Sequence, residues 1–371
     1  MHRPGDSLAR RSKPNRARML TTRPTYHRHY PFLHVLAASL VSTLLSTGAA
    51  AASTLVITGT GDGHGVGMSQ DGALGYAQHG YTYQAILAHY YTGTALGQAP
   101  AGSVVRVLVG SKVQRIPLER YVRGVVAAEE PSSWPLAALE AQAVASRTYA
   151  LTAHAGGSRF DVYSDTRSQM YEGVAAETAS TNAAVAATAG QIVTYAGKPA
   201  ITYFFASSGG MTESVQNSFL GSAPEAWLVG VADPYDSGPA YEWKISMSFG
   251  AAAARLKGLV NGTFRGIEVR TRGVSPRIVA ADVLGSRGSV AASGPELADR
   301  LGLQSAWAYF SVKNGTIVRA EPDRSGRPPS ATPPASTTPS PPAAPVITTG
   351  PQGGSAAPAV AESSATGGVA P

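Results

Sequence analysis

The chain has 371 residues, of which 43% are hydrophobic, and it carries a formal net charge of +7 and no cysteine. The lack of cysteine excludes disulfides and thiol nucleophiles and removes the commonest ligands of structural zinc. Eight of the 30 basic residues but only one of the 23 acidic residues lie in the first 31 positions, so the rest of the chain is charge-balanced. Nucleic-acid binding, which needs a basic stripe with interleaved aromatics, is therefore not expected.

The N-terminal segment has the three parts of a secretory signal. Its basic residues are followed by an apolar run from Phe32 to Leu45 and by four alanines, Ala49 to Ala52. This pattern predicts a signal peptide and basic leader over 1–52, directed to the general secretion route. We therefore expect a secreted or cell-envelope protein. It would touch a membrane only through an uncleaved leader, whose apolar run is short for a spanning helix.

A globular region is expected over 53–320, with an N-terminal segment at 59–98 and a core at 103–315. In the N-terminal segment three glycines surround His64 and keep its imidazole accessible. Ser69 and Gln70 then begin a predicted helix that continues to Ala77.

A pair of carboxylates stands in apolar surroundings near the middle of the chain. Glu129 and Glu130 follow four small or branched apolar residues, and a proline and a nearby tryptophan come after them. Burial of a carboxylic acid raises its pKa, which leaves it a proton to donate near neutral pH. Without further information, a solvated loop carboxylate beside a helix start is the alternative. Strands are predicted over 104–109 and 113–117 before the pair, and an Ala-rich helix over 135–155 after it.

The elements that follow mix helix and strand. A helix is predicted over 178–189, and residues 191–195 and 200–206 are expected to form a strand pair around a short turn. Further strands are predicted over 242–248, 264–271 and 277–283. This order indicates an α+β fold with mixed sheets and an Ala-rich helix after the carboxylate pair, and not a doubly wound sheet.

The segment 321–371 changes to Pro, Ala, Ser, Thr and Gly. Such a composition does not bury enough apolar area to offset the entropy of ordering the chain. We expect a disordered tail that acts as a spacer through an envelope or as a site of O-glycosylation.

Three separate segments of the chain look like the signature segments of one family. They are Tyr121–Tyr149, Ala206–Ser214 and Gly63–Gln70, and three motifs in one chain are far more specific than any one of them. The chain resembles the SpoIID family, which comprises the stage II sporulation protein D enzymes and relatives described as amidase enhancers. The former are lytic transglycosylases of peptidoglycan. The resemblance implies a SpoIID-like fold and glycan strands of peptidoglycan as substrate.

The resemblance also implies which residues form the site. The family's acid is the Glu of a Gly-Val-Val-x-x-Glu-Met-Pro pattern, and Glu129 is the matching residue. Glu130 stands where the family usually has Met. Because consecutive residues of an extended segment point to opposite sides, we expect Glu130 to face solvent. The residues expected to bind substrate are Gln142, Arg147, Ser207, Ser208, Gly209, His64 and Gln70.

Structural roles remain open for several of these residues. Arg147 either contacts a substrate oxygen, steadies the carboxylate or forms a structural salt bridge. Ser207 and Ser208 either bind sugar or form a tight turn. His64 either orients Glu129, hydrogen-bonds the glycan or satisfies backbone groups within a turn. No cofactor is implied. No metal site is expected either, because the histidines are scattered and the cysteines that hold zinc in some family members are missing.

The chemistry implied by the resemblance needs one carboxyl group. Hydrolysis of a glycoside normally uses two carboxylates, of which one protonates the leaving oxygen and the other activates water or attacks the sugar. A lytic transglycosylase instead uses the substrate's own muramyl hydroxyl as nucleophile, so Glu129 alone serves as acid and then as base. The alternative is a catalytically silent wall-binding module or amidase enhancer, which would act on a cell-wall amidase.

Overall fold

The computed structural model describes residues 53–313. The signal peptide expected over 1–52 and the tail expected over 321–371 lie outside these residues. Within 53–313, none of the helices combines the length and the apolar character needed to cross a membrane.

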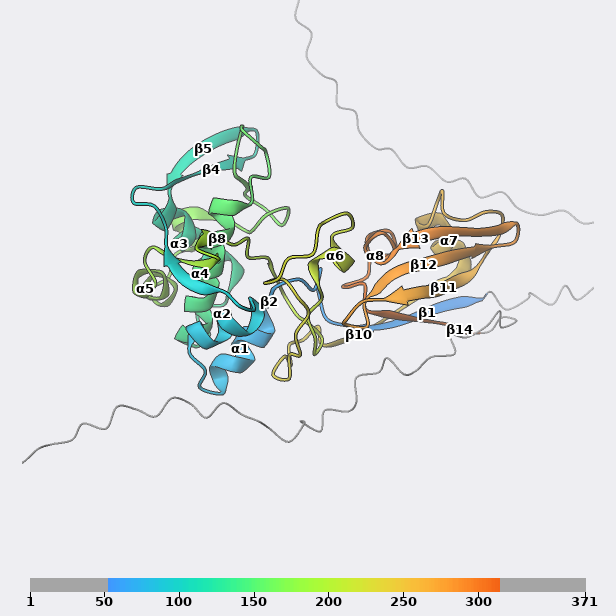
Figure 1. Ribbon diagram of the computed structural model, residues 1–371. Helices are drawn as coiled ribbons and strands as arrows, with labels where there is room; N and C mark the ends of the chain where they lie inside the picture. Colours follow the sequence, from blue (N-terminus) through green and yellow to red (C-terminus); the bar gives the residue numbers. More distant parts are fainter. Residues whose placement is uncertain (1–52, 314–371) are drawn as a thin grey trace, which may run out of the picture. The chain divides into compact units, whose positions relative to one another are not determined.

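An Ala-rich helix, α4 (Leu136–Thr152), is the centre of the helical part (Figure 1). Its residues are buried around most of its circumference, and it contributes to two hydrophobic clusters, one through Val144 and the other through Leu139. A helix that is apolar all round is one that other elements cover. The helices that pack on it are α1 (Gln70–Gln78), α2 (Tyr83–Tyr90), α3 (Leu118–Glu129) and α5 (Ala179–Ala187).

Short strands complete the helical part. The order β5-β4-β6 forms one sheet, β3-β7-β8 forms a second, and β2 pairs in parallel with β9. The bounds are β2 (Met68–Ser69), β3 (Ala95–Gln98), β4 (Val104–Val109), β5 (Lys112–Pro117), β6 (Val162–Tyr163), β7 (Gln191–Tyr195), β8 (Lys198–Pro199) and β9 (Phe204–Phe205), with the short helices η1 (Gly173–Ala176) and α6 (Val215–Ser218).

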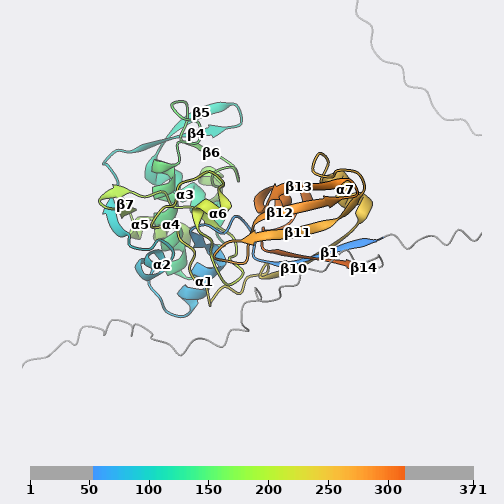
Figure 2. The same ribbon diagram turned by 45° about the vertical axis from the view of Figure 1, so that its right-hand side comes forward.

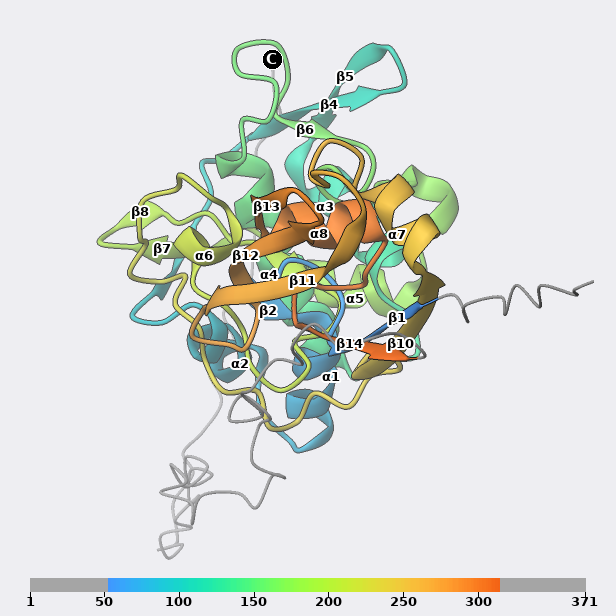
Figure 3. The ribbon, with the colours of Figure 1, turned by 90° about the vertical axis from the view of Figure 1, so that its right-hand side faces the viewer.

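Two three-stranded antiparallel sheets and two helices share a separate core (Figures 2 and 3). In the first sheet β1 lies between β10 and β14, so the first and last strands of the described chain are neighbours. The bounds are β1 (Thr54–Thr60), β10 (Glu242–Ser248), β11 (Phe264–Arg272), β12 (Ile278–Gly285), β13 (Gly288–Ser293) and β14 (Ala308–Lys313), with α7 (Phe249–Arg255) and α8 (Gly294–Leu301).

The predicted α+β class is confirmed, whereas one predicted strand pairing is wrong. Residues 200–206 do not form a strand paired with β7; β7 pairs instead with β3 and with the two residues of β8. Thr202 donates to the carbonyl of Ala145 on α4, and the carbonyl of Ile201 accepts from Trp227. These contacts fix residues 201 and 202 without strand pairing. Within residues 200–206, only Phe204 and Phe205 form a strand, β9.

Candidate functional site

Glu129 is the last residue of α3, and both of its carboxyl oxygens accept hydrogen bonds. The backbone N–H of Met170 donates to Oε1 at 2.6 Å, and Nε2 of Gln70 donates to Oε2 at 3.2 Å. The side chain is half-buried. Glu129 and Gln70, which are 59 positions apart in the sequence, are thus the two predicted site residues that the structure brings into direct contact.

A glycine allows the loop that carries Met170 to approach α3. A Cβ added to Gly124 would lie 2.7 Å from the Tyr171 ring and 2.9 Å from Cα of Gly173. The carbonyl of Gly124 also accepts from the N–H of Glu172 at 3.3 Å. Gly124 therefore permits the close packing that places the Met170 N–H on the carboxyl of Glu129.

The surroundings of Glu129 favour retention of its proton. Burial raises its pKa above the ordinary value of 4.5, while the hydrogen bonds from Met170 and Gln70 oppose this rise because they stabilise the carboxylate. A carboxyl group balanced in this way can both give and take a proton.

Glu130 is buried, so the prediction that it faces solvent is wrong. Its side chain is 5% exposed, and its backbone is extended (φ −123°, ψ 140°) directly after the helical Glu129. The two residues belong to different backbone conformations, and the alternation of an extended segment does not apply. Burial, together with the charges of Glu129 and Asp71, raises the pKa of Glu130 well above its ordinary value. Burial also raises the pKa of Asp71 to about 6, with Asp236 and Asp62 adding to the effect.

The predicted serine motif forms a buried turn around Asp236. The hydroxyls of Ser207 and Ser208 donate to this carboxylate at 3.0 and 2.7 Å, and the backbone N–H of Gly209 donates at 3.1 Å. Both serines are fully buried, and Gly209 has a φ of +70°. A Cβ there would meet Oγ1 of Thr60 at 2.6 Å. This arrangement favours the structural turn, because neither hydroxyl is free to contact a ligand.

Gln142 and Arg147 are both fully buried on α4. The Arg147 guanidinium forms two 2.8 Å hydrogen bonds with the Glu119 carboxylate and donates to the carbonyl of Gln191 at 3.0 Å. Nε2 of Gln142 donates to the hydroxyl of Ser146 at 3.0 Å. The placement of Arg147 favours the structural salt bridge, and the carboxylate that it holds is that of Glu119, not that of Glu129.

His64 lies in a turn and faces a group of aromatic rings. Its Nδ1 accepts from the N–H of Val66 at 3.1 Å, and its ring lies 5.0 Å from that of Phe219 and 5.4 Å from that of Phe205. Burial, with the positive charge of Arg277, lowers the pKa of His64 to about 4. The imidazole is therefore neutral at neutral pH. In the described chain, no hydrogen bond joins His64 to Glu129.

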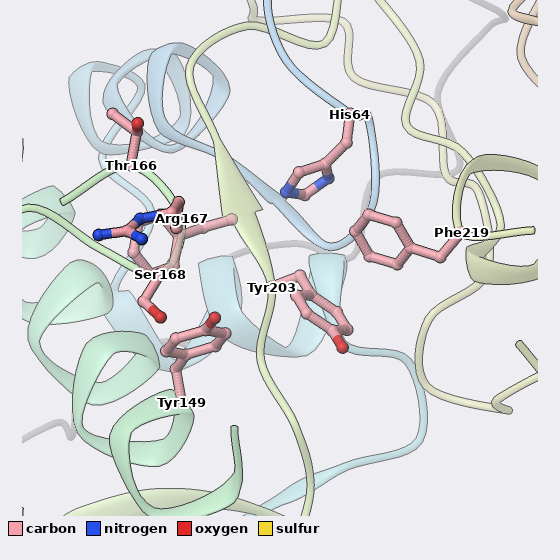
Figure 4. Close-up of a pocket in the computed structure, with 8 residues that line it drawn as sticks. His64, Tyr149, Thr166, Arg167, Ser168, Tyr203 and Phe219 are labelled. Carbon is pink, nitrogen blue, oxygen red and sulfur yellow. The ribbon is translucent and has the colours of Figure 1, made fainter. Parts of the chain in front are cut away.

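His64 lines a cavity of about 280 Å³ between aromatic walls (Figure 4). Tyr203 and Phe219 stand beside His64, and Tyr149 and Arg167 face them from the opposite side. The loop of Arg167 and Ser168 continues directly to Met170, the partner of Glu129. The lining residues are His64, Tyr149, Thr166, Arg167, Ser168, Tyr203, Phe204 and Phe219.

Several residues of this region were not predicted. Asp236 and the N–H of Met170 organise the site through contacts that are distant in sequence, and no local pattern points to such contacts. The aromatic lining gave no signal either, because single tyrosines and phenylalanines are typical of any core. Across residues 53–313, no three His, Asp or Glu side chains are grouped so that they could hold a metal ion.

Comparison with known proteins places the chain in a family. The family model described as SpoIID, Stage II sporulation protein, matches residues 110–195. An uncharacterized protein of Brachyspira hyodysenteriae is 36% identical over 187 residues, which are 50% of this chain and 48% of that protein. The amidase enhancer of Bacillus subtilis is 35% identical over 127 residues, 34% of this chain and 17% of the enhancer. Stage II sporulation protein D of Bacillus subtilis is 31% identical over 251 residues, 60% of this chain and 68% of that protein. The chain thus belongs to the SpoIID family.

Proposed function

We propose that this protein is a peptidoglycan lytic transglycosylase of the cell envelope, with Glu129 as its acid and base. The observation that carries the proposal is the Glu129 carboxyl group. It is half-buried, has a raised pKa and is fixed through both oxygens by Met170 and Gln70. Membership of a family whose relatives include stage II sporulation protein D supports the choice of a cell-wall substrate.

The reaction returns Glu129 to its starting state. The protonated carboxyl first gives its proton to the oxygen that joins a muramyl residue to the next sugar, and the bond from the anomeric carbon to that oxygen breaks. A hydroxyl of the same muramyl residue attacks the anomeric carbon and gives its proton to the Glu129 carboxylate. One product ends in a new hydroxyl and the other in an anhydro-muramyl sugar. No water is consumed, so a second carboxylate is not required.

The proposal is tested by digestion of purified glycan strands, both with and without peptide stems, followed by mass analysis of the ends. We expect anhydro-muramyl ends from the wild type and a loss of about 10²–10⁴-fold in rate for Glu129→Gln, the range that positioned proton transfer supplies. Glu172→Gln is the matched control, since Glu172 lies exposed on the loop that contacts Glu129. Reducing ends in place of anhydro ends would show hydrolysis and contradict the proposed reaction.

A second candidate function is that of an amidase enhancer without catalytic activity of its own. Similarity to the amidase enhancer over 127 residues supports it, as does the fact that Glu129 is not among the residues that line the cavity. In this case the protein would bind glycan strands, leave them uncleaved and raise the rate of a purified cell-wall amidase. Glu129→Gln would then enhance the amidase as well as the wild type does.

A further inference from the structure

Gln70 contacts the carboxyl group of Glu129. Its side-chain amide donates to Oε2 of Glu129 at 3.2 Å. The same side chain lowers the pKa of Glu130, against the larger effects of burial and of the Glu129 and Asp71 charges, which raise it. Gln70 is half-buried and is the first residue of α1. Its hydrogen bond thus joins the first residue of α1 to the last residue of α3.

The backbone around Gln70 is fixed from several directions. The N–H of Asp71 donates to the carbonyl of Ala206 at 2.9 Å. The hydroxyl of Ser69 accepts from the N–H of Gly72 at 3.1 Å and lies 3.3 Å from the Asp236 carboxylate, to which it donates. The buried turn around Asp236 therefore holds the start of α1, and through it the direction in which the Gln70 side chain leaves the backbone.

A carboxamide suits a group that changes its protonation state. The Met170 N–H is a fixed donor to Oε1 of Glu129, whereas the Gln70 amide carries donors on its nitrogen and an acceptor on its oxygen. The nitrogen bonds the carboxylate form, and rotation of the amide by half a turn presents the oxygen to the protonated form. Either state of Glu129 thus keeps a partner on Oε2. The bond to the charged carboxylate is the stronger of the two, so the net effect of Gln70 is to lower the pKa of Glu129.

We propose that Gln70 is a positioning residue that holds the Glu129 carboxyl in place through both proton transfers, and that it is not a ligand of the sugar. This inference rests on the proposed function of Glu129. A ligand of the sugar would mainly affect substrate binding. A positioning residue affects the turnover rate and the titration of the acid.

The kinetic test compares Gln70→Leu with Gln78→Leu, an exposed glutamine at the other end of the same helix. For Gln70→Leu we expect kcat to fall about 10- to 100-fold, part of the range that positioned proton transfer supplies, with KM within about twofold of the wild type. The alkaline limb of the pH profile should move to higher pH, because a hydrogen bond that stabilises the carboxylate has been removed. A rise in KM at constant kcat would overturn the proposal.

A second measurement does not depend on catalysis. The carboxyl carbon of Glu129 is followed by NMR in protein labelled with ¹³C-glutamate, and its resonance is identified by its loss in Glu129→Gln. We expect Gln70→Leu, and Gln70→Ala as a second variant, to raise the pKa of Glu129, while Gln78→Leu leaves it unchanged. An unchanged titration in the Gln70 variants would overturn the positioning role. If no form of the protein cleaves glycan, the proposed function fails, and this titration still decides whether Gln70 controls Glu129.

Discussion

At the scale of single residues, Glu130 is a carboxyl group that folding removes from water. Glu130 keeps its proton to a higher pH in the folded protein than in the unfolded chain, because burial and the charges of Glu129 and Asp71 raise its pKa. A group whose folded pKa is raised binds more protons in the folded state at intermediate pH. Its contribution to stability is therefore complete below about pH 4.5 and is lost as the pH rises.

Glu130→Gln should therefore stabilise the protein at pH 7.5 and have little effect at pH 4. Glutamine keeps the shape of the protonated acid and does not ionise. A tenfold change in acid dissociation corresponds to about 1.4 kcal/mol, so we expect a gain of about 1–3 kcal/mol at pH 7.5 in urea unfolding. Glu242→Gln, at an exposed position of β10, is the control. An equal effect of Glu130→Gln at both pH values would refute this account.

At the scale of elements, Arg147 links α4 to α3 and β7 through hydrogen bonds. Its guanidinium pairs with Glu119 near the start of α3 and donates to the backbone of Gln191 at the start of β7. Arg147 is fully buried, whereas the side chain of Glu119 is 38% exposed. Loss of the arginine thus leaves a carboxylate that water can still reach, together with a carbonyl that loses a donor.

Arg147→Met should destabilise the protein by about 1–3 kcal/mol, because an ion pair with a partly exposed carboxylate and a hydrogen bond to a carbonyl are lost together. Glu119→Gln should cost at least as much, because it leaves the fully buried guanidinium without its counter-ion, although the amide still accepts one hydrogen bond. Both values come from chemical unfolding, and glycan affinity is measured on the folded fraction. An affinity loss in Arg147→Met without loss of stability would instead support substrate contact by Arg147.

The elements that could be predicted from the sequence are those marked by a local pattern of residues. The strand ranges 104–109 and 242–248 agree with β4 and β10, since alternation and flanking turn residues are local signals. Helix α3 was not predicted, and Glu130 was misplaced as a result. The contacts of Glu129 with Gln70 and of Ser208 with Asp236 join residues 59 and 28 positions apart, and no local pattern encodes such partners.

At the scale of the whole described molecule, buried charges join the sheet core to the serine turn. The Arg277 guanidinium donates to the carbonyls of Met211 at 2.9 Å and Ser208 at 3.1 Å. Nearby, the fully buried Glu213 accepts from the N–H of Val274 at 3.0 Å and from the hydroxyl of Ser275 at 2.6 Å. Residues 208–213 and 274–277 are thus connected by hydrogen bonds of the buried Arg277, Glu213 and Ser275, and buried polar groups are costly to separate from their partners.

Arg277→Gln should raise the pKa of His64. The pKa of His64 is lowered to about 4 by burial and, secondly, by the charge of Arg277, so removal of the charge should raise it while burial keeps it below 6.5. Arg277→Lys is the matched variant, because it keeps the positive charge but loses the planar guanidinium group that donates to two carbonyls. The ring resonance of His64, identified by its loss in His64→Gln, is titrated by NMR, and unfolding is measured in urea. Both variants should lose stability, whereas only Arg277→Gln should shift the titration; an identical shift in the lysine variant would assign the effect to repacking and not to charge.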